Sequence, residues 1–492
     1  MFLRVFSVLT ILTLALSAVQ PLPGQAAAGD NFSAALNERM PELLAKYRVP
    51  GAVVSYIQNG EVAWTKTYGL ADRAAQKPMS AKMIFNFGST GKVLTGWGVM
   101  RLVEQGKVDL DAPVNQYLKH WQIQSMDYDA QKVTLRRLLS HTAGLTVSGF
   151  SDYSQRRHLP SLEEMLAGHN QTDGTVTLFR EPGTGYQYSG GGFVMLQMVI
   201  EDVSGESFAQ FMQREVTTPL GMPSLHWAWT PELSAMAPVP YGPQQEALGY
   251  RQLASQAIGS EIGTVPDYAR FVAAAVGGPN GEPPGRGVLQ PETIAAMSKA
   301  QPNAKNEGLA YGVTTVENGG MLQHFGNNPG WSAFFSIDTY RREGLVMAAN
   351  SSNGFPLCAT VQNLWIKTLY NLSDPLVERA PEPESLPLQA VIELALAGLL
   401  ALALLIAAAV FILHLRAGKR TWAGRPTAKG LVWAGIWALL ALFWIYWFYS
   451  TLPLPFTPGF PDFWRTPQVD LVTGLLLAWT AFSLVKAWYP RK

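Results

Sequence analysis

The long apolar runs near the C-terminus constrain this fold more than any other feature of the sequence. No charged residue interrupts the Ala/Leu-rich stretch from Leu394 to Val410. A second apolar run extends from Gly430 to Tyr449, and a shorter third one from Leu471 to Val485. An α-helix needs about 20 apolar residues to cross the hydrocarbon core of a bilayer. The pattern predicts a C-terminal domain, residues 389–492, of three transmembrane helices.

The charges around these runs predict their orientation. The connection between the first two runs has five basic residues and no acidic one: Arg416, Lys419, Arg420, Arg425 and Lys429. Loops rich in Lys and Arg remain in the cytoplasm. This connection and the C-terminal tail are therefore expected in the cytoplasm, and the residues before Leu394 outside it.

The N-terminus independently predicts export. Residues 1–28 combine Arg4, the apolar run Val5–Val19 and the small residues Ala26–Ala28, as secretory signal peptides do. Residues 373–388 are rich in proline and acidic residues, which indicates a linker. The sequence thus predicts a multi-pass protein of the bacterial cytoplasmic (inner) membrane, with residues 29–372 as a periplasmic domain.

Residues 29–372 carry the patterns of an α/β domain. Asn59-Gly60, a dipeptide typical of hairpins, separates the strand-like runs Val53–Ile57 and Val62–Thr67. Trp331–Ile337 and Gly344–Ala349 form a second such pair. Apolar residues at helical spacing lie between the pairs, in Gly91–Val103, Leu135–Leu139, Gly192–Val203 and Pro266–Val276. We expect one antiparallel sheet that joins both pairs, flanked by helices and accompanied by an all-helical insert.

Charge and cysteine content narrow the range of partners. The net charge is +1, and the first 380 residues contain no run of Lys and Arg. Because neutralising phosphates requires clustered cations, a nucleic-acid partner is not expected. The single cysteine, Cys358, cannot form an internal disulfide or a multi-thiolate site. The histidines lack the spacing of metal ligands, so we expect no metal and no cofactor.

Ser89-Thr90-Gly91-Lys92 is the candidate catalytic motif. Residues three apart on a helix face the same way, so Lys92 can reach Ser89. A serine hydroxyl is a weak nucleophile unless a neighbouring base takes its proton. The chain contains a second Ser-x-x-Lys, Ser483 to Lys486, at the end of the last apolar run. There the lysine is expected to extend toward the membrane surface. The other motifs in the sequence must therefore distinguish the two copies.

Together with Ser89–Lys92, these other motifs resemble those of the class C β-lactamase and penicillin-binding-protein-like serine hydrolase family. The resemblance covers about residues 35–370 and keeps the motifs in family order. It rests on Ser89–Lys92, Leu135–Leu145, Pro182–Gly192, Pro219–Met222 and His324–Gly326 followed by Pro329-Gly330. It implies a fold like that of β-lactamases and DD-peptidases, and a serine hydrolase that needs no metal.

The resemblance also implies roles for particular residues. Ser89 would be the acylated nucleophile, with Lys92 and Tyr188 as its proton-transfer partners. His324 and Gly326 match the strand that lines the substrate, and the backbone N–H groups of Ser89 and Asn327 would form the oxyanion hole. The sequence departs from the family at Gly190, where the Tyr-x-Asn motif has asparagine. That departure argues against β-lactam hydrolysis, and a side-chain-free wall there could admit a bulkier substrate.

Several functions remain open at this point. The leading hypothesis is hydrolysis of an amide or peptide bond, with a D-configured residue as one option, outside the cytoplasmic membrane. The domain order resembles membrane-bound peptidases that mature non-ribosomal-peptide prodrugs. Carboxylesterase activity is the nearest alternative, because the same site would cleave esters, and β-lactamase activity ranks third. A sensor of β-lactams or peptidoglycan that is acylated without turnover is a fourth possibility. The expected partners are a small peptide, amide or ester and the lipid bilayer.

Overall fold

A computed structural model describes residues 25–154, 158–168, 174–316, 319–372, 388–449 and 467–490. Most of the predicted signal peptide, in residues 1–24, lies outside the described part. The same holds for nearly all of the predicted linker, residues 373–387, and for the connection 450–466 between the second and third apolar runs. The boundaries predicted for these segments stay predictions.

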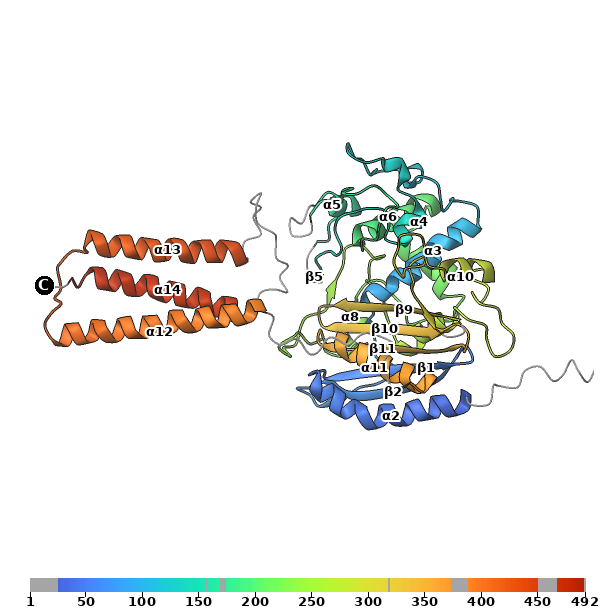
Figure 1. The fold of residues 1–492 in the computed structure, drawn as a ribbon, viewed down its shortest axis with the longest axis horizontal. Helices are drawn as coiled ribbons and strands as arrows, with labels where there is room; N and C mark the ends of the chain where they lie inside the picture. Colours follow the sequence, from blue (N-terminus) through green and yellow to red (C-terminus); the bar gives the residue numbers. More distant parts are fainter. Residues whose placement is uncertain are drawn as a thin grey trace, which may run out of the picture.

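A seven-stranded antiparallel sheet forms the centre of the part of the chain before residue 373 (Figure 1). Strands from the two ends of the domain are neighbours: β1 pairs with β11 from Ala52 opposite Ala349 to Ile57 opposite Gly344. The order across the sheet is β3 (Lys77–Pro78), β2 (Glu61–Asp72), β1 (Gly51–Gln58), β11 (Glu343–Ala349), β10 (Trp331–Asp338), β9 (Gly319–Asn328) and β8 (Gly312–Val316). The predicted union of the two hairpins in one antiparallel sheet is confirmed.

Local chemistry explains the first hairpin. Asn59 and Gly60, between β1 and β2, have φ angles of 53° and 73°. Two consecutive positive φ angles are what a tight turn matched to the twist of the strands requires, and Asn and Gly adopt them most readily.

Helices cover both faces of the sheet. On one face, α2 (Gln25–Lys46) and α11 (Gly354–Tyr370) bury a cluster that includes Leu36 and Trp365. On the other face, α9 (Val265–Ala273) and the helical region beyond it share a larger core. The principal helices of that region are α3 (Gly91–Glu104), α4 (Leu135–Leu139), α6 (Gly190–Ser204) and α7 (Phe208–Met212). The helices α3, α4, α6 and α9 lie at the four helical positions that the sequence predicted, whereas α2, α7 and α11 were not predicted.

Shorter elements complete this region. They are β4 (Phe85–Asn86), η1 (Gly88–Thr90), η2 (Val114–Gln116), η3 (Ala130–Lys132), β5 (Tyr153–Ser154), α5 (Leu162–Leu166), η4 (Gln213–Thr217), α8 (Pro231–Ala235), β6 (Arg251–Gln252), β7 (Ile262–Gly263) and α10 (Pro291–Met297).

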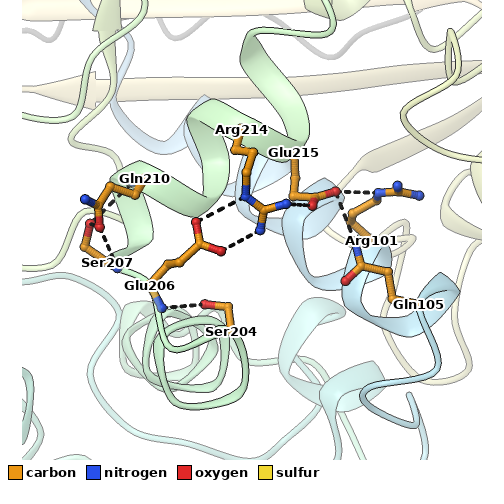
Figure 2. Close-up of polar contacts among 8 residues, drawn as sticks. All are labelled: Arg101, Gln105, Ser204, Glu206, Ser207, Gln210, Arg214 and Glu215. Atoms are coloured by element: carbon orange, nitrogen blue, oxygen red, sulfur yellow. Dashed lines mark hydrogen bonds and ion pairs between the residues drawn. The ribbon is translucent and has the colours of Figure 1, made fainter.

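A polar network holds the far end of α3 against η4 (Figure 2). Arg101 Nε donates to Glu215 Oε2 at 2.8 Å, and Gln105 Nε2 donates to the same oxygen at 3.1 Å. Arg214 pairs with Glu215 and also with Glu206, where one N–O distance is 2.6 Å. Because these contacts join separate helices, they orient α3, the helix that begins at the candidate nucleophile.

Three C-terminal helices lie side by side (Figure 1): α12 (Leu388–Arg416), α13 (Ala428–Tyr449) and α14 (Pro467–Ala487). One segment, Ala397–Arg416, is long and apolar enough to cross a membrane, with a mean hydropathy of 2.7, and most of it is exposed. Among the described residues, the other two apolar segments, Ala428–Phe443 and Leu471–Ala487, are shorter than that criterion requires. The structure therefore supports one long apolar helix, and three membrane spans stay a prediction.

The basic connection and the end of α14 lie together. The backbone N–H of Thr427 donates to the Ala487 carbonyl at 2.9 Å, and that of Ala423 donates to the Trp488 carbonyl at 3.1 Å. The rings of Trp422 and Trp488 stack at 4.7 Å. The basic stretch 416–429 thus shares one end of the helical bundle with the C-terminal end of the chain.

Candidate active site

A rigid turn presents Ser89 at the start of α3. The preceding strand β4 pairs with β7, which places Asn86 opposite Ile262. The Asn86 side chain accepts a hydrogen bond from the Gly88 backbone N–H at 3.0 Å. Ser89 lies in the one-turn helix η1, directly before Gly91 begins α3. The nucleophile candidate is therefore held by backbone contacts on its N-terminal side and by a buried helix on its C-terminal side.

Lys92 reaches Ser89 as the spacing predicted. Its Nζ lies 3.1 Å from Ser89 Oγ and donates to the Ile258 carbonyl at 2.5 Å. The lysine is 2% exposed. Burial lowers the pKa of Lys92 to about 7, against the opposing effect of the Glu261 carboxylate. A lysine that is partly neutral near pH 7 can accept the proton of a serine hydroxyl.

Tyr188 lies against the same pair. Lys92 Nζ is 5.3 Å from the centre of the Tyr188 ring. Burial raises the pKa of this phenol well above its usual value, and a hydrogen bond with Ser89 is the one influence that lowers it. The phenol is thus protonated in the resting site and can donate a proton.

His141 positions this tyrosine. Its ring packs on the Tyr188 ring with centres 4.3 Å apart, and its Nδ1 accepts the Ser189 backbone N–H at 3.1 Å. Ser189 in turn caps α6, because its hydroxyl accepts the Gly192 N–H at 3.2 Å. Sequence spacing does not mark His141 as part of the site. Its contact with Tyr188 follows from packing that no spacing rule reveals.

Strand β9 brings His324, Gly326 and Asn327 to the nucleophile turn. A Cβ at Gly326 would overlap the Phe87 carbonyl oxygen and lie 3.0 Å from the Ser89 nitrogen. Only glycine therefore lets the strand approach the turn this closely. The approach places the backbone of Asn327, the next residue, beside that of Ser89, as the predicted oxyanion hole requires.

His324 faces the same site as a neutral group. Its Nδ1 lies 2.7 Å from the Phe325 carbonyl oxygen. Burial and the charge of Lys92 lower the pKa of His324 to about 4. Its ring therefore offers hydrogen bonds to a substrate near neutral pH, but no charge.

Gly190 does not leave an empty wall. It is the first residue of α6, and a Cβ there would meet the Ser148 carbonyl at 3.1 Å and the Phe150 ring at 3.4 Å. The loop that carries Phe150 already fills the space next to Gly190. The expectation that Gly190 makes room for a bulkier substrate is therefore wrong, because that space is taken by a side chain of this chain.

A small pocket of about 10 Å³, with room for one water molecule, lies next to β9. It is lined by Asn86 and Ser260 near the nucleophile turn, by Asn328 of β9, and by the aromatic residues Trp227, Trp229 and Trp331. The rings of Trp229 and Trp331 stack with centres 5.8 Å apart.

Glu261, whose carboxyl lies against Gly91, carries no motif or spacing by which it could have been predicted. It is 1% exposed, and burial raises the pKa of its carboxyl to about 8.

Within the described ranges, no cluster of three or more His, Cys, Asp and Glu could hold a metal ion.

Comparison with known proteins agrees with this geometry. The family described as "Beta-lactamase" matches residues 36–364. Esterase EstB of Burkholderia gladioli is 31% identical over 204 residues, covering 39% of this chain and 50% of the esterase. Penicillin-binding protein 4* of Bacillus subtilis is 28% identical over 178 residues, covering 36% of this chain and 38% of that protein. The matches thus span half or less of the length of these two relatives.

Solved structures share the fold. The D-alanine carboxypeptidase AmpC of Burkholderia cenocepacia superposes with a TM-score of 0.55 at 19% identity, covering 70% of this chain and all of that one. The octameric penicillin-binding protein homologue of Pyrococcus abyssi gives a TM-score of 0.55 at 21% identity, covering 68% of this chain and 77% of that one. The predicted arrangement of an antiparallel sheet with helices is therefore that of known β-lactamase-like structures.

Proposed function

The chain belongs to the beta-lactamase family and is a serine hydrolase, and from this premise we propose that it cleaves an amide or peptide bond through an acyl-enzyme on Ser89. The observation that carries the proposal is the buried contact of 3.1 Å between Lys92 Nζ and Ser89 Oγ. A buried lysine at hydrogen-bond distance from a serine is what activates that hydroxyl for attack on a carbonyl carbon.

The neighbouring groups support a complete acyl-transfer cycle. As Ser89 Oγ bonds to the carbonyl carbon, its proton passes to Lys92, and the carbonyl oxygen becomes an oxyanion. The backbone N–H groups of Ser89 and Asn327 would stabilise that oxyanion. The tetrahedral intermediate then collapses and expels the leaving group, which takes a proton from Tyr188. A water molecule then attacks the acyl carbon and gives a proton to Tyr188. Lys92 returns its proton to Ser89 Oγ, and the acyl group leaves as a carboxylic acid.

An amide demands more of this site than an ester does, because the leaving amine must be protonated before it departs. Tyr188 meets that demand, since its pKa is raised and it lies against Lys92 and Ser89.

Carboxylesterase activity is the second candidate, favoured by the 31% identity to an esterase. β-Lactam hydrolysis ranks below it, because Gly190 replaces the expected asparagine and Phe150 packs against it. A non-turning-over sensor is a further alternative that the same experiment addresses.

A turnover panel separates these functions. The full-length protein in detergent is assayed with an N-acyl-D-amino-acyl anilide and its L-isomer, a short-chain aryl ester and a chromogenic cephalosporin, with Ser89→Ala as the background. We expect the wild type to hydrolyse an anilide well above this background. Turnover of the ester alone would identify a carboxylesterase, and a stable adduct without turnover would identify a sensor.

We also propose that residues 389–492 anchor the hydrolase in the bacterial cytoplasmic membrane, with residues 29–372 outside and 373–388 as the linker. The apolar helix Ala397–Arg416 supports one span. The shared end of the basic connection and the C-terminal end of α14 supports placing both in the cytoplasm. A reporter fused after Lys492 should be active in the cytoplasm; a periplasmic signal would overturn the three-span topology.

A further inference from the structure

A short segment packs against the back of the nucleophile turn. Ala257 accepts a hydrogen bond from Thr95 Oγ1 at 3.0 Å, and Ile258 accepts one from Lys92 Nζ at 2.5 Å. The carbonyl of Glu261 accepts the Phe87 N–H at 3.2 Å. Residues 257–261, which we name the backing segment, therefore contact the chain before Ser89 as well as the helix that follows it.

The Glu261 side chain points from this segment to the start of α3. A Cβ at Gly91 would overlap its carboxyl group, so glycine inside the Ser-x-x-Lys motif makes room for a buried acid. The carboxyl oxygen Oε1 is buried and has no hydrogen-bond partner. The carboxyl as a whole is hydrogen-bonded to the Gly91 backbone and the Thr90 side chain. A buried oxygen without a partner is nevertheless costly, and proteins retain such groups mostly where they serve a function.

We propose that Glu261 is the charge partner of Lys92: a positioning residue, packed against Gly91, whose negative charge sets the pH at which Lys92 can accept the proton of Ser89. This inference rests on the proposed role of Ser89 and Lys92, and it assigns a further residue to that site. Glu261 touches neither the substrate nor Ser89 in this account, and it acts only through the charge of the lysine.

The groups around this pair keep a constant charge near neutral pH. Tyr268 of α9 and Tyr188 lie close enough to feel the charge of Glu261, and burial raises the pKa of both phenols. His141 and His324 face Lys92, and burial lowers the pKa of both imidazoles. Among the groups that act directly on Lys92 or Glu261, only these two change protonation near neutrality. Glu307, whose pKa burial raises to about 7, acts on Tyr188 instead.

This arrangement gives the acyl-transfer step a balanced charge. When Lys92 takes the proton of Ser89, an ammonium forms at a site that is 2% exposed. An unpaired charge buried there would be strongly destabilised. If Glu261 is ionised at that moment, the new ammonium is compensated. If Glu261 holds the proton instead, Lys92 is neutral and ready to act as the base.

The test is the pH dependence of fluorophosphonate labelling, measured as the second-order rate constant for the full-length protein in detergent. Two coupled groups lose their protons in two macroscopic steps, so the acidic limb of the wild type should be broad. In Glu261→Gln only Lys92 titrates, so the rate should rise with pH in a single step. Because the negative charge is gone, this rise should lie about one pH unit lower than in the wild type, which is the lower end of the effect of a neighbouring opposite charge on a pKa. Identical limbs for the variant and the wild type would overturn the proposal.

Two further variants keep the test decisive. Glu343→Gln removes another fully buried glutamate, which bonds Tyr56 in the sheet, and should leave the limb in place. Gly91→Ala should displace the Glu261 carboxyl and shift the acidic limb of the labelling rate in the same direction as Glu261→Gln does. This variant replaces Glu261→Gln in the test if Glu261→Gln proves to be unfolded in a thermal scan. An unchanged limb in a folded Gly91→Ala variant would also count against the proposal.

The outcome separates this inference from the proposed function. Labelling that persists in Ser89→Ala would mean that the proposed nucleophile is wrong. Labelling that requires Ser89 but keeps its limb in Glu261→Gln would refute only the role of Glu261.

Discussion

Lys92 Nζ lies between Ser89 Oγ, at 3.1 Å, and the carbonyl of Ile258, at 2.5 Å. The carbonyl holds the amine in place, and the serine is the group with which it exchanges a proton. The contact with the Ile258 carbonyl thus fixes the position of the Lys92 amine, and the contact with Ser89 identifies the hydroxyl that this amine deprotonates. This relationship separates the first Ser-x-x-Lys motif from the second, at Ser483, which lies in α14.

The pH dependence of acylation should follow Lys92. Because burial lowers the pKa of this amine to about 7, the fraction of neutral lysine rises as pH increases through that value. Labelling by a fluorophosphonate should therefore fall below about pH 7 and rise above it. Lys92→Arg, which stays protonated, should label slowly and without this limb, whereas Lys486→Arg should match the wild type. A wild-type limb in Lys92→Arg would remove the lysine from the mechanism.

Tyr188→Phe should slow amide hydrolysis by about 10²-fold, the usual contribution of a positioned proton donor. Tyr186→Phe is the matched control, because Tyr186 lies two residues away and interacts with Glu307 and Lys305 rather than Ser89. That variant should stay within a few-fold of the wild type. Steady-state turnover of the best anilide substrate measures both effects. Equal rates for Tyr188→Phe and the wild type would contradict the assignment.

Gly326→Ala should reduce acylation by about 10²- to 10³-fold, the cost of disturbing an oxyanion hole. The added Cβ would overlap the Phe87 carbonyl oxygen and push β9 away from Ser89. Gly320→Ala tests the same substitution in the same strand, where the nearest neighbour of a Cβ is Thr339 Oγ1 at 3.8 Å. Labelling rates, with thermal unfolding as a check on the fold, distinguish a local effect from a general one. Similar losses in both variants would argue against a specific role for Gly326.

Much of the fold could be predicted because its signals are local. Asn59-Gly60 specifies a turn through its own backbone preferences, and the helical spacing after Gly91 lies within one element. The order of motifs pointed to Ser89, Lys92, Tyr188 and His324, which the structure places around one another.

The rest depends on contacts between distant parts of the chain. Glu261 reaches Gly91 only after the backing segment has packed on α3, and no spacing rule marks a lone buried acid. Phe150 fills the space beside Gly190 for the same reason: the loop that carries it is remote from α6 in the sequence. Such contacts decide how a site differs from its family, whereas motifs reveal only what it shares with the family.

The account depends most directly on Ser89 as the nucleophile. The decisive measurement is the intact mass and peptide map of the full-length protein after reaction with a fluorophosphonate, with Ser89→Ala and Ser483→Ala in parallel. We predict one adduct per chain on the peptide that contains Ser89, retained in Ser483→Ala and absent from Ser89→Ala. An adduct on a different serine, or full labelling of Ser89→Ala, would contradict the account.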